Sequence, residues 1–403
     1  MKVLFLAYFF PKPDNPVMGT WALTQAQALV RQGIDLQVVS FTSWVPKAIA
    51  LSQGARTYAN CPDTYVWPGG VTAHYPRWLY YPVQPFKQWA YVNPTPYLQL
   101  AWWTAKHRLM QCIDNYQPDL IFCHHTLPNA WIVAQLPAAY QRPLIVLDHD
   151  FDEIADGRHY PKRRAAMEIT AKRADLLLAV SKRMATDLQQ QFPLATVKTL
   201  HNGVNLPPKE FAHQPRPAEI QNKTVVLACA LFAERKGIPI LIQAFHQILT
   251  KYPDAILRII GNGPEEEKIR RTIQQLDMGE RVQLVGRQPH NQVLQEMAWA
   301  DCFALVGWDE PFATVYLEAM AAGKPIICCD DGGITDVIEH GVHGLMVPPR
   351  DQTATANALD RILSNHAECL TMGQQARHLI EQRLTWDAKA GELVSLFDQI
   401  RKQ

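Results

Sequence analysis

The sequence lacks an apolar run long enough to cross a membrane. Its amino-terminal apolar run, VLFLAYFF, ends after eight residues at Pro11, and no small-residue cleavage site follows it. A run of this length is too short for a transmembrane helix and makes a poor signal peptide. We therefore expect a cytoplasmic protein.

The sequence also lacks paired cysteines. None of its eight cysteines belongs to a CxxC pair or shows the spacing of metal ligands, and several lie inside apolar runs such as VVLACALF and PIICC. This placement favours buried free thiols in a reducing compartment over disulfides or a cysteine-based metal site.

Acidic residues are scarce in one stretch of the chain. Between Asp35 and Asp114 the only acid is Asp63, whereas six bases occur there, at positions 47, 56, 77, 87, 106 and 108. Over residues 1–206, 19 Lys and Arg face 13 Asp and Glu, which gives a net charge of +6 and leaves 20 against 25, or −5, for residues 207–403. Halves of opposite charge suggest different partners, although drift of surface charge also produces such asymmetry.

Length and composition favour a globular protein with two domains. At 403 residues the chain exceeds one ordinary core, and 48% apolar with 19% charged residues excludes a disordered chain or a membrane bundle. Apolar β-type runs alternate with helical patterns in two series, from KVLFLAYFF to DLLLAVS and from TVVLACAL to KPIICCD. Continuous apolar runs indicate strands covered on both faces, as in parallel sheets with helical crossovers.

A proline-rich segment separates the two series. Residues 203–223 carry prolines at 207, 208, 215 and 217, which forbid regular structure and indicate a linker. We therefore predict an α/β protein with two doubly wound, Rossmann-like domains, over residues 1–205 and 206–385, that face a central cleft. Ligands of such sheets bind outside the carboxyl ends of the strands.

Two glutamates stand near a predicted helix start in WDEPFATVYLEAMAAGKP, residues 308–325. Pro311 suits the first helical position, which would put Glu310 just before the helix and Glu318 about two turns into it. The carboxylates would then lie roughly 12 Å apart along the axis, too far to share a proton as an acid/base pair.

The amides between these glutamates suit an anion. The free amides of Phe312, Ala313 and Thr314 would point out of the helix start, where the helix dipole favours negative charge. A ligand with a phosphate in its middle and hydroxyls at both ends fits this arrangement. A nucleotide-sugar is such a ligand.

At this point the sequence resembles the retaining glycosyltransferases of family 4, which have the GT-B fold. The family's E-x7-E hallmark, followed by an alanine/glycine segment, matches Glu310 to Glu318 and AMAAGKP. MGTWALTQAQALVRQGIDLQVV resembles the family's glycine loop and first helix, and ADLLLAVS resembles the end of its first domain. Further matches occur in the family's order: HNGVN (201–205), RKG (235–237), GNGP (261–264), LVG (284–286), GG (332–333) and HGLMVPP (343–349).

The resemblance implies roles for single residues. Glu318 would bind the ribose hydroxyls, and Glu310 would lie at the donor sugar. Lys236 would neutralise the diphosphate leaving group, because a positioned cation stabilises the charge that develops on phosphate oxygens. Arg235 and Gly19 would also belong to the donor site, and the amides after Pro311 would hold sugar and phosphate.

The chain also departs from the family pattern. A glycine-arginine pair usually precedes the KG, and Ala230 and Leu231 stand there instead, so a second phosphate-binding cation is missing unless Arg235 replaces it. The proline-serine pair usual before the first glutamate is Val306-Gly307 here. Pro311 stands where a small residue is usual and removes one amide from the anion site.

Two histidines end apolar strands at family-like positions. His124 ends DLIFCHH, and a position at the donor sugar and a purely structural role both remain open for it. His149 ends VLDHD at a second such position, and we expect His125 to be an exposed neighbour of His124.

Metal and nicotinamide chemistry are the less favoured interpretations. Asp148-His149-Asp150 spells D-x-D, which chelates a divalent cation in another glycosyltransferase class, but the resemblance implies a metal-independent enzyme. GNGPEE lacks the third glycine of a dinucleotide fingerprint and places carboxylates where phosphate would sit. We therefore expect no metal and no cofactor.

The basic stretch is rich in aromatic residues. Residues 65–103 contain five tryptophans and six tyrosines among the scattered bases. This mixture suits contact with anionic lipid or stacking on sugar rings, whereas the alternative is a covering loop and helix whose aromatics pack inside. No recognised motif supports nucleic-acid binding.

The sequence thus predicts a metal-independent hexosyltransferase of the retaining GT-B type. Residues 1–205 would bind the acceptor, 206–385 the nucleoside diphosphate sugar, and the helix over 386–403 would cross back to the first domain, as in the family. The acceptor would be a glycan, a lipid-linked molecule or a small molecule, reached in the cytoplasm with or without peripheral membrane contact. A hydrolysing nucleotide-sugar epimerase and a non-catalytic nucleotide-sugar-binding scaffold are the alternatives.

Overall fold

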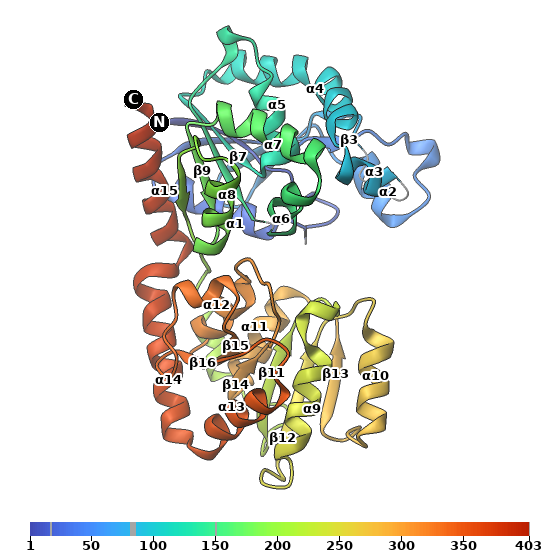
Figure 1. Cartoon of the computed structure of the whole chain (residues 1–403), viewed down its shortest axis with the longest axis vertical. Coiled ribbons are helices and arrows are strands. Elements are labelled where there is room, and N and C mark those ends of the chain that lie inside the picture. Colours follow the sequence, from blue (N-terminus) through green and yellow to red (C-terminus); the bar gives the residue numbers. More distant parts are fainter. Residues whose placement is uncertain (17, 81–85, 150, 403) are drawn as a thin grey trace. The chain divides into compact units, whose positions relative to one another are not determined.

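The computed structural model describes all residues except 17, 81–85, 150 and 403, and omits the side chains of 86, 87, 151–153 and 156. The chain forms two compact units (Figure 1). The N-terminal unit comprises residues 1–201 and 386–403, and the C-terminal unit comprises residues 202–385. Both are α/β units built on parallel sheets, so the predicted fold class is confirmed.

An eight-stranded sheet is the core of the N-terminal unit. Its strand order is β10-β9-β8-β7-β1-β2-β5-β4, and β4 is antiparallel to its neighbour. The strands are β1 (Lys2–Leu6), β2 (Asp35–Val39), β4 (Thr64–Trp67), β5 (Val71–His74), β7 (Leu120–His124), β8 (Leu144–Asp148), β9 (Leu176–Ala179) and β10 (Val197–Thr199), and a separate parallel pair consists of β3 (Thr42–Ser43) and β6 (Arg77–Trp78). Every residue of β7, β8 and β9 is buried, as their continuous apolar runs predict.

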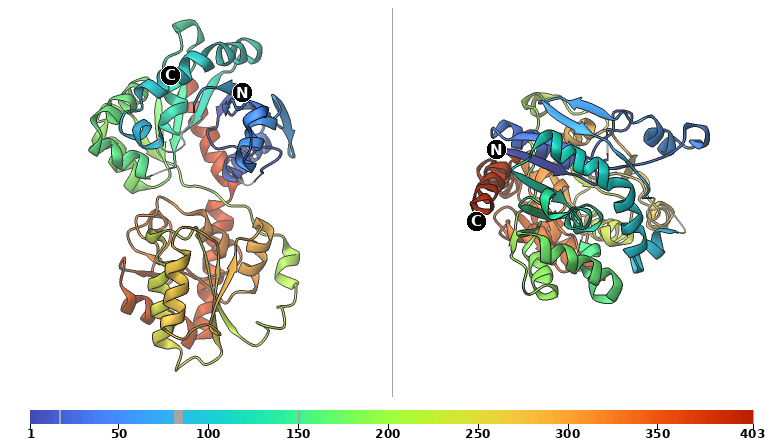
Figure 2. Two further views of the ribbon diagram at one scale, coloured as in Figure 1. Left: turned by 90° about the vertical axis from the view of Figure 1, so that its right-hand side faces the viewer. Right: turned by 90° about the horizontal axis from the view of Figure 1, so that it is seen from above.

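The helices of this unit pack in two groups. Helix α1 contacts β2, β5 and α15, whereas α4, α5 and α7 contact one another (Figure 2). The helices are α1 (Thr20–Arg31), α2 (Gln53–Asn60), α3 (Phe86–Val92), α4 (Thr95–Tyr116), α5 (Trp131–Ala134), α6 (Phe151–His159), α7 (Pro161–Arg173), α8 (Lys182–Gln191) and α15 (Trp386–Arg401), with short turns η1 (Lys47–Ile49), η2 (Thr126–Ala130) and η3 (Ala138–Tyr140). Phe397 of α15 lies edge-on to Phe122 of β7, which ties the last helix into this core.

A six-stranded parallel sheet forms the core of the C-terminal unit, in the order β13-β12-β11-β14-β15-β16. Its strands are β11 (Thr224–Cys229), β12 (Ala255–Ile260), β13 (Val282–Gly286), β14 (Cys302–Ala304), β15 (Ile326–Cys329) and β16 (Gly344–Val347). The helices are α9 (Ile238–Ile248), α10 (Glu266–Gln275), α11 (His290–Trp299), α12 (Thr314–Ala321), α13 (Gln352–Ser364) and α14 (His366–Leu379), with short turns η4 (Lys209–His213), η5 (Glu234–Lys236), η6 (Gly333–Asp336) and η7 (Ile380–Leu384).

The strand orders locate the ligand-binding edge of each sheet. In the C-terminal unit the order reverses between β11 and β14, and in the N-terminal unit it reverses between β1 and β7. Loops that leave the carboxyl ends of such strands diverge to opposite faces, which opens a crevice for ligands. The segments after β11, β14, β1 and β7 are therefore where functional side chains are expected.

The cysteines match the predicted free thiols. All eight are free, and six of them are buried. Within the part of the chain that the structure describes, no helix combines the length and the apolarity needed to cross a membrane.

Candidate active site

The loops after β11 and β14 bring two cations to one carboxylate in the C-terminal unit. The Lys236 Nζ atom lies 2.6 Å from Glu310 Oε1, and Arg235 Nη1 lies 3.5 Å from the same oxygen. The Glu310 side chain is only 3% exposed, against 15% for Lys236 and 39% for Arg235. A buried carboxylate requires such pairing, because leaving it uncompensated in a low-dielectric site is costly.

Gly237 allows these loops to meet. It has a φ of +66°, and a Cβ atom built on it would lie 2.4 Å from the carbonyl oxygen of Val306. An L side chain would be strained at this φ and would also clash with the backbone, so the RKG glycine is required by close packing. This contact sets Lys236 beside the segment that carries Glu310.

The predicted helix start at Pro311 is wrong. Helix α12 begins at Thr314, and Ala313 precedes it in an extended conformation with φ −69° and ψ 117°. The cause is a long-range contact: the Glu310 carbonyl accepts a hydrogen bond of 2.9 Å from the Gly333 amide, which holds the chain extended before the helix.

Because the helix begins later than predicted, the amides that could face an anion belong to different residues. Phe312 is buried, and its carbonyl oxygen accepts from Asn202 Nδ2 at 3.5 Å. Thr314 is the first helical residue, so the amides available at this helix start are those of Thr314 and Val315, whereas the Tyr316 amide donates to the Ala313 carbonyl at 3.3 Å. Ala313 occupies the N-cap position, directly before the first helical residue.

Glu318 lies in the second turn of α12 and has a partner that the sequence did not reveal. The His290 ring Nε2 lies 2.8 Å from Glu318 Oε1. The hydrogen bond to Glu318 raises the pKa of His290 above its usual 6.5, and burial acts in the opposite direction. His290 opens α11 four residues after β13, so a histidine just beyond the LVG strand was the one available signal.

This pair predicts a pH-dependent contribution to stability. A raised pKa in the folded state means that the contribution is complete below the unfolded pKa near 6.5 and is lost as the pH rises through the higher folded value. We expect His290→Gln to lower the thermal unfolding midpoint more at about pH 5.5 than at about pH 8.5. Exposed His246 of α9, changed to Gln, is the control. An effect of His290→Gln that is equal at both pH values would contradict the charged pair.

In the N-terminal unit, three histidines gather at the ends of β7 and β8. The His124 ring lies 4.3 Å from that of His149, measured between centroids, and its Nε2 lies 2.7 Å from Gln25 Oε1 of α1. His124 is only 1% exposed, and burial, with the two neighbouring histidines, holds its pKa well below the usual range. Its ring is therefore neutral and held by α1, which suits positioning better than proton transfer.

The expectation that His125 is exposed is wrong. It is buried, has a φ of +67°, and lies edge-on to Phe9, because β7 ends in a sharp turn that directs the chain back into the core. His149 is half-buried and lies beside His124 and Trp21.

The backbone conformation and the packing at position 19 both require a glycine. Its φ is +81°, and a Cβ atom would lie 2.5 Å from the carbonyl carbon and oxygen of Phe9. It is the residue before α1, so its lack of a side chain lets the helix begin against the segment that follows β1. The predicted donor contact of Gly19 stays a prediction.

The first residue of the D-x-D segment, Asp148, has a structural role. The buried Asp148 carboxylate accepts from the Thr126 amide at 2.9 Å and from the Thr126 hydroxyl. Asp150 lies outside the described residues. Among the residues that the structure does describe, no group of three His, Cys, Asp or Glu side chains could hold a metal ion.

Two family models match the chain over most of its length. Residues 18–207 match the model for Glycosyltransferase Family 4, and residues 210–379 match the model for Glycosyl transferases group 1. The chain belongs to the family-4 type of GT-B glycosyltransferases. It is therefore an enzyme of the transferase class.

Similar proteins agree with this family. An uncharacterized glycosyltransferase of Methanocaldococcus jannaschii is 27% identical over 411 residues, which span 98% of each protein. The GDP-mannose-dependent alpha-(1-6)-phosphatidylinositol monomannoside mannosyltransferase of Mycolicibacterium smegmatis is 27% identical over 301 residues, or 69% of the chain and 78% of that protein. The crystal structure of Anabaena HepE in complex with UDP-glucose has a TM-score of 0.72 and 20% identity, covering 99% of the chain and 100% of that structure.

The predicted site residues thus form separate groups. Glu310, Arg235 and Lys236 meet beside the strand-order reversal between β11 and β14 of this glycosyltransferase. Glu318 pairs with His290 instead. His124 and His149 form the cluster of the N-terminal unit.

Proposed function

We propose that the protein is a retaining glycosyltransferase that moves a sugar from a nucleoside diphosphate sugar to an acceptor hydroxyl. The observation that carries the proposal is the meeting of Lys236 and Arg235 on the buried Glu310 carboxylate at the strand-order reversal. Cations held there are placed to stabilise a departing diphosphate. The donor-binding residues are Glu318, Phe312, Ala313, Thr314, Arg235, Gly19 and His149, with Glu310, Lys236 and His124 nearest the reaction.

The proposed reaction needs no paired general acid and base. In front-face transfer, a leaving-phosphate oxygen takes the proton of the acceptor hydroxyl while the sugar passes through an oxocarbenium-like state. The protein then contributes positioning and stabilisation of the leaving charge. The two cations outweigh the single negative charge of Glu310, so the site keeps a net positive charge for the diphosphate, which supports a metal-independent reaction.

The nucleotide is proposed from the neighbours. Anabaena HepE was solved with UDP-glucose, and the mycobacterial relative uses GDP-mannose. We therefore propose a hexose donor linked to uridine or guanosine diphosphate. Incubation with both donors and a panel of acceptors tests this: nucleotide release that depends on acceptor indicates a transferase.

The same experiment separates the two alternatives. Release of nucleotide with a free altered sugar indicates an epimerase, and binding without turnover indicates a scaffold. An epimerase needs a carboxylate free to act as acid or base, whereas Glu310 is paired with two cations and Glu318 with His290. These pairings favour the transferase.

Glu318→Ala is expected to weaken nucleotide binding by roughly 10- to 150-fold. A buried ribose would lose a charged hydrogen-bond acceptor, which costs about 1.5 to 3 kcal/mol. Calorimetry with free nucleoside diphosphate measures the change, and Glu310→Gln is the matched control, which should lower turnover more than nucleotide affinity. A larger loss of nucleotide affinity in Glu310→Gln than in Glu318→Ala would mean that the ligand lies in the reverse direction.

We also propose peripheral contact with an anionic membrane on the acceptor side. Of the tryptophans in the basic stretch, Trp67 and Trp78 are buried, as the packing interpretation requires. Trp89 and Trp103, however, are 73% and 67% exposed. The other large apolar side chains exposed on this unit include Trp44, Ile49, Leu51, Val92 and Leu100.

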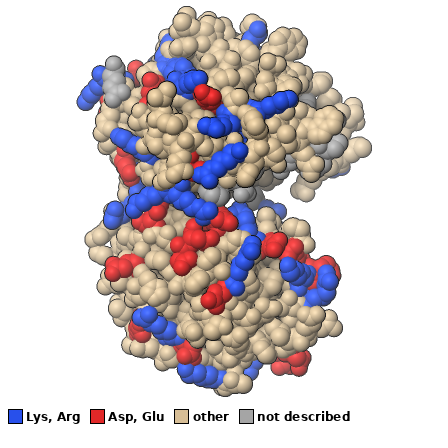
Figure 3. All heavy atoms as spheres, in the orientation of Figure 1, with Lys and Arg blue, Asp and Glu red and all other residues tan. Residues whose placement is uncertain are grey.

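Charge on the N-terminal unit supports the same contact. On the face shown in Figure 3, Lys and Arg are spread over the N-terminal unit with some Asp and Glu among them, and side chains of both signs mix on the C-terminal unit. Exposed Lys47 lies between Trp44 and Ile49 in the chain, and half-buried Lys106 follows Trp103 on α4. Amphipathic surfaces that mix bases with Trp and Leu bind anionic lipid interfaces. This surface would serve a lipid-linked acceptor.

A further inference from the structure

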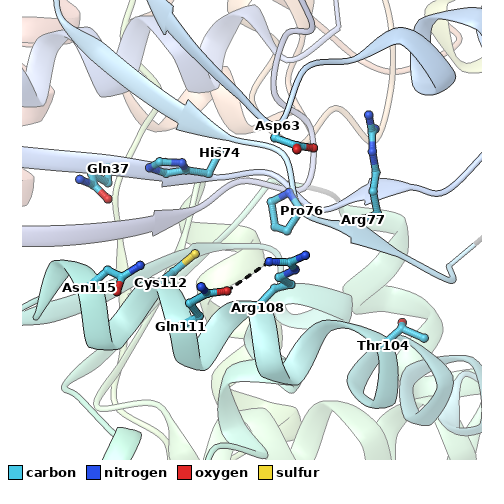
Figure 4. A pocket seen from close by; sticks show the side chains of 10 residues that line it. All are labelled: Gln37, Asp63, His74, Pro76, Arg77, Thr104, Arg108, Gln111, Cys112 and Asn115. Atoms are coloured by element: carbon cyan, nitrogen blue, oxygen red, sulfur yellow. Dashed lines mark hydrogen bonds between the residues drawn. The ribbon is translucent and has the colours of Figure 1, made fainter.

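A pocket lies inside the N-terminal unit, between helix α4 and the strands β2 and β5 (Figure 4). Its volume is about 450 Å³, which lies within the usual range of small-molecule sites. Side chains from α4 form one wall, and side chains from the strands and the following loops form the other. None of these residues belongs to the histidine cluster or to the proposed donor site.

The helical wall is rich in hydrogen-bond donors. Arg108, Gln111 and Asn115 are exposed and line the pocket from successive turns of α4. Arg108 Nη1 donates to Gln111 Oε1 at 3.2 Å, which leaves its other guanidinium N–H groups to face a ligand. Figure 4 shows these side chains rising from α4 toward the strands.

The opposite wall adds neutral polar groups and one acid. Gln37 of β2 and His74 of β5 face the helix across the pocket, and Asp63 lies at its rim (Figure 4). Burial lowers the pKa of His74, and its Nδ1 lies 3.1 Å from the Thr64 hydroxyl, so the ring is a neutral hydrogen-bonding group near pH 7. An amide, an imidazole and a carboxylate are suitable partners for sugar hydroxyls.

Arg77 and Arg108 have different roles in this pocket. Arg77 donates from Nη1 to the Tyr58 carbonyl at 2.9 Å and from Nη2 to the Cys61 carbonyl. These bonds anchor it to the chain around α2, so it contributes a fixed positive charge. Among the described residues, the Arg108 guanidinium hydrogen-bonds only to Gln111 of its own helix, so Arg108 is the cation able to bind an anion directly.

The pocket is suited to binding and not to covalent chemistry. Its one thiol, Cys112, is half-buried, and burial raises its pKa although Arg108 acts in the opposite direction. A thiol with a raised pKa stays protonated at neutral pH and is a weak nucleophile.

The pocket lies over β2 and β5, which β1 separates from β7 and β8, and it spans the sheet from end to end, since His74 is the last residue of β5. Asn115 stands at the end of α4, just before the chain enters the amino end of β7 at Leu120. His124 and His149, in contrast, lie at and beyond the carboxyl ends of β7 and β8. A ligand in this pocket would therefore be held apart from the transferred sugar.

We propose that this pocket binds an anionic sugar, in which hydroxyl groups accompany a phosphate ester or a carboxylate. Two arginines against one aspartate favour an anion, and the fork of Arg108 matches the oxygens of either group. The amides of Gln37, Gln111 and Asn115 suit the hydroxyls. The site goes beyond the proposed donor and acceptor and would serve a second glycan contact or an effector.

Calorimetry on the full chain tests the pocket with three probes: glucose 6-phosphate, glucuronate and neutral glucose. At least one anion should bind, and glucose should bind at least about tenfold more weakly. The phosphate and carboxylate arms identify which anion the site takes. Failure of both anions to bind the wild type, or binding of glucose as tight as that of the anions, overturns the proposal.

Three variants test where the anion binds. Arg108→Gln should weaken it at least about tenfold, because a charged hydrogen bond is lost. Lys106→Gln removes the same charge from the same helix outside the pocket and should change the affinity less than about twofold. Lys236→Ala should also retain binding, since it alters only the proposed donor site. Unchanged affinity in Arg108→Gln, or loss in Lys236→Ala, overturns the assignment whether or not the proposed transferase activity is found.

Discussion

Replacing Lys236 with alanine should lower turnover by about 1,000-fold, the upper end of what the loss of one preorganised electrostatic contact costs. Lys236 is the more deeply placed of the two cations at Glu310, and its Nζ lies 2.6 Å from the carboxylate, against 3.5 Å for Arg235. The arginine usual in the family is replaced by Leu231, which is exposed and brings no charge. Without Lys236, the departing phosphate would depend on Arg235, backbone amides and water. Single-turnover kinetics at saturating donor measures the effect on the chemical step.

Arg235→Ala is the matched control. Its guanidinium is more exposed than the Lys236 ammonium group, and solvent screens its charge, so we expect a loss of less than about tenfold. Thermal unfolding of both variants shows whether the buried Glu310 destabilises the unit once a cation is gone. Near-normal turnover in Lys236→Ala together with a severe loss in Arg235→Ala would make Arg235 the phosphate cation and shift the family alignment by one residue.

The core strands were predictable because their signal is local. Continuous apolar runs identified β1, β2, β7, β8 and β9 of the first sheet and β11 to β15 of the second; of these, β13 lies at a sheet edge and the others lie in the interior of their sheets. The same rule missed β4, β5, β10 and β16 and the short pair β3 and β6. Three of the four residues of β4 are exposed, β5 alternates buried with half-buried residues, and no residue of β10 is buried. A short strand without a continuous apolar run carries too weak a pattern to be separated from a loop.

The parts of the site that the sequence did not predict depend on contacts between distant segments. The start of α12 is displaced because the Gly333 amide bonds the Glu310 carbonyl across 23 residues. His290 meets Glu318 over a separation of 28 residues, and no local pattern encodes that meeting. The E-x7-E spacing, by contrast, was enough to predict that the two carboxylates lie too far apart to share a proton. The family resemblance assigned Glu310, Lys236 and Arg235 to the donor site, but the ion pairs of both cations with Glu310 were not predicted.

Reversing three lysines of the N-terminal unit should abolish its preference for anionic membrane. We would change Lys47, Lys87 and Lys106 to Glu together and omit Arg77, because its bonds to backbone carbonyls stabilise the fold. Each base near an anionic surface contributes about 1 kcal/mol. Loss of three such contributions should lower liposome binding by more than about 100-fold. Co-sedimentation with neutral and anionic liposomes at low salt measures the effect.

Salt and aromatic variants decide whether the contact is a membrane interface. The Debye length falls from about 10 Å at 0.1 M salt to about 3 Å at 1 M, so the wild type should lose most of its anionic preference at high salt. Trp89→Ala with Trp103→Ala should weaken binding to both lipid types, because these exposed rings would insert at the headgroup level. The buried Trp78 is unsuitable for this test, since its loss would disturb the core. Equal recovery of the wild type with neutral and anionic liposomes, or undiminished binding at about 1 M salt, would exclude the electrostatic contact. The exposed aromatics would then be left to a soluble glycan acceptor, on whose sugar rings they could stack.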